Sequence, residues 1–155
     1  MDLIKKLTGK NQSDYEQAAA HIINDADEKT FEELVQKDDF LFDFIKQNVA
    51  KRLNRACNQD NFKNLLKFLK YYSPSYDEFI AKTLAHFSDN EVQNKMIELL
   101  KNGTDSEKAY SAKYFSIKPE NSIIEELKNN AYADFEPLAI NSTSALSSVQ
   151  ERTSV

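Results

Sequence analysis

Apolar residues in this 155-residue chain follow a helical spacing, and the whole pattern returns every 31 residues. Large apolar residues occupy one position of the repeat, and small residues occupy the position three earlier. The large set is Ile22, Leu53, Leu84, Phe115 and Leu146, and the small set is Ala19, Ala50, Ala81, Ala112 and Thr143. Positions three apart share one helical face, so the pattern predicts a helix that packs closely on a neighbour in every copy.

A second apolar pattern lies about twenty residues upstream in each copy and predicts another helix. Its members are Leu34, Leu65, Met96 and Leu127, accompanied by Phe31, Phe62, Gln93 and Ile124. Capping residue types precede this helix at Asp27, Asn58, Asp89 and Glu120. The other helix is expected to begin near Asp43, Pro74, Asp105 and Glu136, with Ser73 and Thr104 as caps. Each copy is therefore predicted to be a helix, a turn and a helix.

The predicted organisation is a single helical-repeat domain over residues 1–155. The repeat units are 27–57, 58–88, 89–119 and 120–150, with a helix or partial repeat at 14–24 and a tail at 151–155. First helices are expected near 28–38, 59–72, 90–102 and 120–132, and second helices near 40–57, 75–87, 105–117 and 135–149. Gly103 is expected to end a helix in the left-handed conformation.

The predicted fold class is all-α, as an α-solenoid of stacked helical hairpins. The chain has only two glycines and three prolines, and tight hairpin turns and phosphate-binding loops usually require glycine. This composition favours helices over strands. Two helices cannot bury their apolar faces alone, and copies with matching positions bury them by stacking on one another. An ordinary helical bundle whose pattern imitates a period is the alternative.

These residues resemble the HEAT-like repeat family, in particular its short bacterial units of about 31 residues. The resemblance covers residues 27–150, and "EPLAINSTSALSSV", Glu136 to Val149, resembles the second helix of such a unit. Ala145 and Leu146 stand in the family's small-then-large position. The family includes scaffold proteins and bilin lyases, so the resemblance implies a fold and not an activity. The aromatic segment "DFLFDFI", Asp39 to Ile45, departs from the pattern.

Charge and composition narrow the partners and the compartment. The formal charge is -5, and residues 1–43 hold eleven acids against five bases, so no basic stripe for nucleic acid dominates the chain. No segment approaches the roughly 20 apolar residues of a membrane span, and the opening residues lack the apolar core of a secretory signal. Cys57 is the single cysteine and cannot form an intramolecular disulfide. We expect a soluble, cytoplasmic protein without a membrane partner.

Basic residues recur on the second helix and predict a partner-binding surface. Lys51, Lys82 and Lys113 share one repeat position, and Arg52, Arg55 and His86 lie close to it in the sequence. In a HEAT-like array the second helices line the concave face, where such a ladder would bind an acidic protein surface. The alternative is that these side chains are solvated or paired with acids of adjacent units.

The sequence predicts no catalytic, cofactor or metal site. His21 and His86 do not share a repeat position, and Cys57 has no histidine or second thiol at a ligand spacing. Adjacent acids such as Glu32 and Glu33 point in different directions on a helix. The last predicted helix lacks the charged outer face of a terminal cap, which leaves open further repeats or a second copy at this end.

The predicted function is a noncatalytic protein–protein interaction scaffold that binds a partner on its repeat surface. The alternative is a helical-repeat enzyme or a chromophore-handling module resembling bilin lyases or nucleic-acid glycosylases. A lyase-like protein would carry a tyrosine or histidine in a pocket, and a glycosylase-like one an acid at the centre of a basic groove.

Overall fold

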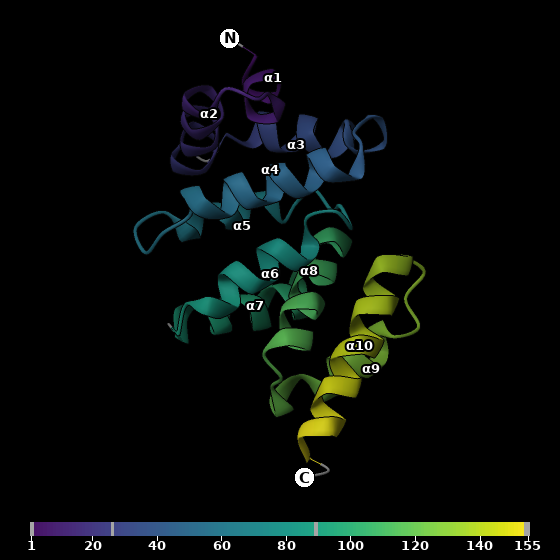
Figure 1. Cartoon of the computed structure of the whole chain (residues 1–155). Coiled ribbons are helices and arrows are strands. Elements are labelled where there is room, and N and C mark those ends of the chain that lie inside the picture. Colours follow the sequence, from purple (N-terminus) through teal and green to yellow (C-terminus); the bar gives the residue numbers. More distant parts are fainter. Residues whose placement is uncertain (1, 26, 89, 154–155) are drawn as a thin grey trace. The chain divides into compact units, whose positions relative to one another are not determined.

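The fold is known from a computed structural model that describes residues 2–25, 27–88 and 90–153 (Figure 1). Every regular element within these ranges is a helix, so the all-α prediction is confirmed there. The α-helices are α1 (Leu3–Thr8), α2 (Gln12–Asn24), α3 (Glu28–Gln36), α4 (Asp43–Ala56), α5 (Leu65–Phe68), α6 (Asp77–His86), α7 (Asn90–Asn102), α8 (Asp105–Ile117), α9 (Ile124–Asn130) and α10 (Glu136–Thr153). Short 3-10 helices cover Asp38–Phe40, Phe62–Asn64 and Asn121–Ile123.

The chain folds as two compact units, Met1–Phe79 and Ile80–Val155. The division falls inside α6, and therefore inside the predicted repeat 58–88. We call these the amino-terminal and the carboxy-terminal unit.

Two of the predicted helices agree with the structure at both ends. Helices predicted at 90–102 and 105–117 are α7 and α8 with the same bounds. The helix predicted at 59–72 is wrong in length, because regular α-helix is confined there to α5. Asn58 Oδ1 accepts hydrogen bonds from the amides of Asp60 and Asn61 at 2.8 and 3.2 Å, which holds this segment in a turn. Asparagine competes with the helix in this way by offering the backbone a local partner.

Several predicted caps form the expected hydrogen bonds. Asp27 Oδ1 accepts from the Thr30 amide at 3.1 Å at the start of α3. Thr104 and Glu107 form a reciprocal capping box at α8, with Thr104 Oγ1 accepting from the Glu107 amide at 3.2 Å. Glu120 accepts from the Ser122 amide at 3.2 Å. The predicted cap Asp89 lies outside the described residues.

Ser73 was expected to cap the helix that follows Pro74, but it stabilises a turn instead. Its Oγ accepts from the Ser75 amide at 3.1 Å, and α6 begins only at Asp77. The prediction placed the helix start two residues too early because Ser-Pro signals a turn as readily as a helix start.

The left-handed conformation predicted for Gly103 is wrong, because its backbone lies outside the left-handed region. Glycine is required there by a close approach. A Cβ at this position would lie 2.5 Å from the Leu99 carbonyl oxygen and 3.0 Å from Glu107 Cβ. The Gly103 amide donates to the same Leu99 carbonyl at 2.9 Å and ends α7. Gly103 therefore lets α7 and α8 follow one another with almost no connecting loop.

In the amino-terminal unit, α2 packs against both α1 and α4. The repeat residues Ile22 and Leu53 are completely buried in this core, and Phe31 of α3 contacts Phe68 of α5 with ring centroids 4.7 Å apart. Glu28 connects the same two segments at the surface, since its Oε1 accepts from Lys70 Nζ and Tyr71 Oη, each at 3.1 Å. These hydrogen bonds hold the pKa of the Glu28 carboxyl below its usual value.

In the carboxy-terminal unit, α8 packs against α7 and most extensively against α10 (Figure 1). Asn141 Nδ2 donates to the Ala109 carbonyl at 3.0 Å, and Ser148 Oγ donates to the Ser116 carbonyl at 2.8 Å. Both pairs are separated by 32 residues and lie in the same order along the two helices. The α8 and α10 helices therefore run parallel, displaced by about one sequence repeat.

The buried residues of the carboxy-terminal unit include most of the predicted repeat positions. Leu84, Met96, Phe115 and Leu127 are each at most 1% exposed. Leu146 in the last copy is only half-buried and Thr143 is exposed. The pattern thus identifies the core well in the earlier copies and less well in α10.

Candidate functional site

The six predicted binding residues are distributed over three helices. Lys51, Arg52 and Arg55 lie on α4 in the amino-terminal unit, whereas Lys82 and His86 of α6 and Lys113 of α8 belong to the carboxy-terminal unit. Arg52 and Lys113 are half-buried, and the other four are exposed. The structure brings Arg52 and Arg55 together at one pocket.

This pocket lies between α2 and α4 and has a volume of about 280 Å³. Its lining residues are Tyr15, Glu16, Ala19, Ala20, Arg52, Arg55 and Ala56. The three alanines are small and leave an apolar floor, while the two arginines and one glutamate supply charge. We call this feature the α2–α4 pocket. Ala19 holds the small position of the sequence pattern, and its short side chain leaves room at the pocket.

Arg52 forms one wall of the pocket and is held in place by three contacts. Its Nη1 donates to the carbonyl oxygens of Leu7 at 2.6 Å and Gly9 at 2.9 Å. Its Cζ lies 3.7 Å from the centroid of the Tyr15 ring, a cation–π geometry. The two carbonyls belong to the last turn and cap of α1, where helix carbonyls lack backbone partners. Much of the hydrogen-bonding capacity of Arg52 therefore serves the amino-terminal unit itself.

Arg55 lies three residues further along α4 and presents its charge to solvent. Within the described part of the chain, its guanidinium forms no ion pair and no hydrogen bond. The pocket carboxylate, Glu16, accepts instead from Gln12 Nε2 at 2.8 Å on its own helix. Arg55 is thus a cation beside an apolar pocket, available to a carboxylate or another anion by a bidentate hydrogen bond.

The histidines do not converge on a metal site. His21 Nδ1 lies 2.7 Å from Asp25 Oδ2 and His21 Nε2 lies 3.6 Å from Asp27 Oδ2, all near the end of α2. His86 contacts the ring of Phe87 with centroids 5.9 Å apart. Among the residues that the structure describes, no group of three or more histidine, cysteine, aspartate and glutamate side chains has a geometry suited to a metal ion.

Cys57 follows the last turn of α4 and is half-buried. Burial raises the pKa of its thiol to about 11, because the thiolate loses solvation. The thiol is therefore protonated near neutral pH and is a poor nucleophile.

We expect alkylation of Cys57 by iodoacetamide at pH 8 to be roughly 100-fold slower in the folded chain than in urea, where the thiol regains its ordinary pKa. The raised pKa also means that the unfolded chain loses this proton first. The contribution of the protonated Cys57 thiol to the free energy of unfolding is therefore intact below about pH 9 and declines as the pH rises toward 11. Mass spectrometry measures the rate, and Cys57→Ser identifies background labelling. Equal rates in the folded and unfolded chains would contradict this account of the thiol.

The sequence prediction missed α1 and the α2 residues of the pocket. Asp2 caps α1 by accepting from the Lys5 amide at 3.1 Å, and Ile4 and Leu7 are buried one turn apart. The Asp2 cap and the spacing of Ile4 and Leu7 are the features of the sequence that indicate this helix, but six residues are too few to show a helical period. Tyr15 carried no signal, because its role depends on Arg52, which lies far away in the sequence.

Two further findings concern the chain as a whole and not the pocket alone. In the described ranges, no helix has both the length and the apolar character needed to cross a membrane. Comparison of the chain with protein-family models, with curated proteins and with solved structures finds no match. Function is therefore inferred from the geometry of the α2–α4 pocket and its surroundings.

Proposed function

We propose that this chain is a noncatalytic protein-interaction domain that binds an acidic segment of a partner at the α2–α4 pocket. The observation that carries the proposal is Arg55, whose guanidinium is unpaired in the described part of the chain and lies beside an alanine-lined floor. A glutamate or aspartate of the partner would pair with Arg55, while a neighbouring apolar group would cover the alanines.

Preorganisation of the pocket supports binding. One wall of the pocket is fixed by Arg52, which joins Tyr15 of α2 to the end of α1. A site that is rigid before association loses little conformational entropy when a partner binds. This arrangement suits recognition of a short segment by a fixed surface.

A HEAT-like solenoid is part of the same proposal. It is supported by the parallel course of α8 and α10, whose contacts join residues 32 apart, close to the 31-residue sequence period. Helices that occupy equivalent places in consecutive repeats run parallel in such arrays. In such an array Lys51, Lys82 and Lys113 would hold equivalent positions on the second helices of consecutive repeats.

A catalytic role for the same pocket is less well supported. Glu16 is the carboxylate beside the two arginines, but it is exposed and bonded to Gln12. General acid chemistry on a glycosidic bond favours a carboxyl shielded from water, whose pKa is raised by burial. The pocket geometry therefore favours binding over the enzyme alternative.

Fluorescence anisotropy with labelled ten-residue peptides tests the proposal. We expect the full chain to bind a peptide that alternates glutamate with leucine, and Arg55→Glu to weaken its affinity at least about tenfold, because a charge-assisted bond becomes a repulsion. Lys29→Glu is the matched control, since Lys29 is exposed on α3 in the same unit and does not line the pocket.

Equal weakening by both substitutions would mean that only the total charge matters and would overturn the pocket assignment. Failure of the wild-type chain to bind any glutamate–leucine peptide more tightly than the matched serine–leucine peptide would overturn the acidic partner. Circular dichroism of each variant verifies that the helices are retained.

A further inference from the structure

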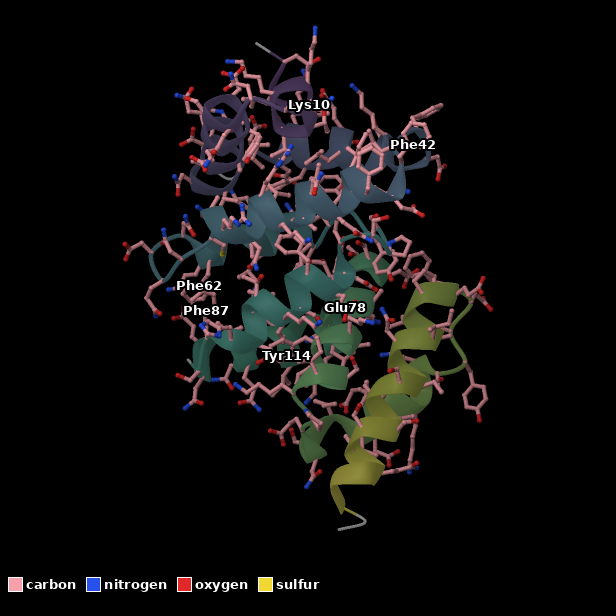
Figure 2. The ribbon with its side chains drawn as sticks, in the orientation of Figure 1. Lys10, Phe42, Phe62, Glu78, Phe87 and Tyr114 are labelled. Carbon is pink, nitrogen blue, oxygen red and sulfur yellow. The ribbon has the colours of Figure 1, made fainter. Side chains whose placement is uncertain are left out.

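Three exposed phenylalanines gather at the start of α4, on the segment that departs from the repeat pattern. Phe40, Phe42 and Phe44 are 86%, 73% and 63% exposed, and we call them the aromatic patch. The rings of Phe42 and Phe44 are stacked, with centroids 6.2 Å apart and planes inclined by 10° (Figure 2 labels Phe42). No other segment in the described residues presents several large apolar side chains so close together in the sequence.

The position of Phe42 conflicts with the needs of folding. Phe42 is the N-cap residue of α4 and provides no side-chain hydrogen bond to the free amides of the first turn. Serine, threonine, aspartate and asparagine are favoured at N-caps because their side chains accept such bonds. Phe42 neither caps the helix nor packs in the core. A residue that breaks a local folding rule and leaves its ring exposed points to a role outside the fold.

The size of the patch indicates a contact surface. An aromatic side chain presents roughly 150–250 Å² to a partner, so the three exposed fractions leave apolar surface on the order of 400 Å². Apolar patches of this size on a soluble domain typically mark sites of interaction. A single exposed side chain, such as Tyr132 at 90% exposure, needs no such explanation.

Charge at the patch specifies the chemistry of the partner. Asp39 directly precedes Phe40, and Asp43 lies between Phe42 and Phe44. Both are exposed, and neither carboxylate forms an ion pair or side-chain hydrogen bond in the described ranges. Residues 1–43 as a whole hold eleven acids against five bases. Phenylalanine faces attract cations, and the two carboxylates pair with them, so both features select a basic group.

The same charges disfavour the other occupants. A membrane surface rich in anionic lipids repels an acidic patch. Self-association of two copies through this patch would place Asp39 and Asp43 of both molecules close together, and like charges in an interface oppose association.

We propose that the aromatic patch docks a cationic partner segment in which lysine or arginine alternates with leucine. Its basic groups lie over the phenylalanine rings and pair with Asp39 and Asp43, and its leucines cover the exposed ring edges. The aromatic patch shares no residue with the α2–α4 pocket and prefers the opposite charge in its partner. An experiment can therefore contradict either proposal without contradicting the other.

The test uses the full chain and a labelled twelve-residue peptide that alternates lysine with leucine. We expect Phe42→Ser to weaken binding at least tenfold without lowering the melting temperature, because serine supplies the missing cap of α4. Tyr132→Ser is the matched control and keeps the wild-type affinity. Asp39→Asn with Asp43→Asn weakens binding and reduces its dependence on salt.

Each remaining outcome overturns the proposal. Unchanged affinity in Phe42→Ser means that the lysines bind elsewhere on an acidic protein. Equal binding of a glutamate–leucine peptide means that the patch is apolar without a charge preference. Association of the chain with itself in sedimentation, abolished by Phe42→Ser, identifies a second copy as the occupant. Patch-dependent binding to anionic vesicles identifies a lipid surface.

Discussion

Replacing Phe115 with alanine is expected to lower the free energy of unfolding of the carboxy-terminal unit by about 3–5 kcal/mol. The side chain is completely buried on α8, and its ring meets that of Tyr114 edge to face, with centroids 5.0 Å apart. Truncation removes this apolar burial and leaves a cavity that the surrounding helices fill only in part. Urea unfolding followed by circular dichroism measures the change.

Leu84→Ala provides an independent test of the same repeat position, since Leu84 is 1% exposed on α6. We expect a loss of about 2–5 kcal/mol. Tyr132→Ala is the surface control and should change the free energy of unfolding by less than about 0.5 kcal/mol. If Phe115→Ala and Leu84→Ala both unfold like the wild-type chain, the large apolar position of the repeat is not a core position.

Arg52→Ala is expected to destabilise the amino-terminal unit by about 2–3 kcal/mol. The substitution removes two hydrogen bonds to the end of α1 and the stacking on Tyr15. Bonds formed by a charged group are stronger than neutral ones, and the two carbonyls lose their partner when the guanidinium is absent. Urea unfolding measures the loss, and hydrogen exchange should show that protection of the α1 amides decreases more than that of α3.

Arg52→Lys separates charge from geometry in this contact. Lysine keeps the positive charge but lacks the planar guanidinium that reaches two carbonyls and lies flat on an aromatic ring. We therefore expect an intermediate loss of stability. If Arg52→Ala leaves the exchange of α1 unchanged, Arg52 does not hold α1 and its guanidinium is available to a partner, as the sequence alone suggested.

The sequence by itself determined the helical class, the bounds of α7 and α8, and much of the core. Small and large apolar residues at a spacing of three identify the buried face of a helix. The structure buries two such pairs in the core, Ala81 with Leu84 and Ala112 with Phe115. Caps such as Thr104 are equally local, since their hydrogen bonds reach only three residues. Local rules of this kind depend on neighbours in the chain and can be read without a structure.

Local rules were less reliable where two of them compete. Asn58 and Asn61 could begin a helix or close a turn, and the turn formed. Gly103 could adopt the left-handed conformation or allow a close approach, and the structure shows the latter. In both cases the residue type fits two backbone conformations of similar energy, and packing selects between them.

Only the tertiary structure decided which charged residues are available to a partner. The sequence grouped Arg52 and Arg55 as equivalent cations, yet Arg52 reaches α1 through contacts more than forty residues apart, whereas Arg55 has no such contact in the described chain. The aromatic segment at Phe42 was visible as an irregularity, but its exposure was not. Exposure and long-range hydrogen bonds depend on which helices meet, and a periodic pattern specifies the buried face of each helix without specifying that meeting.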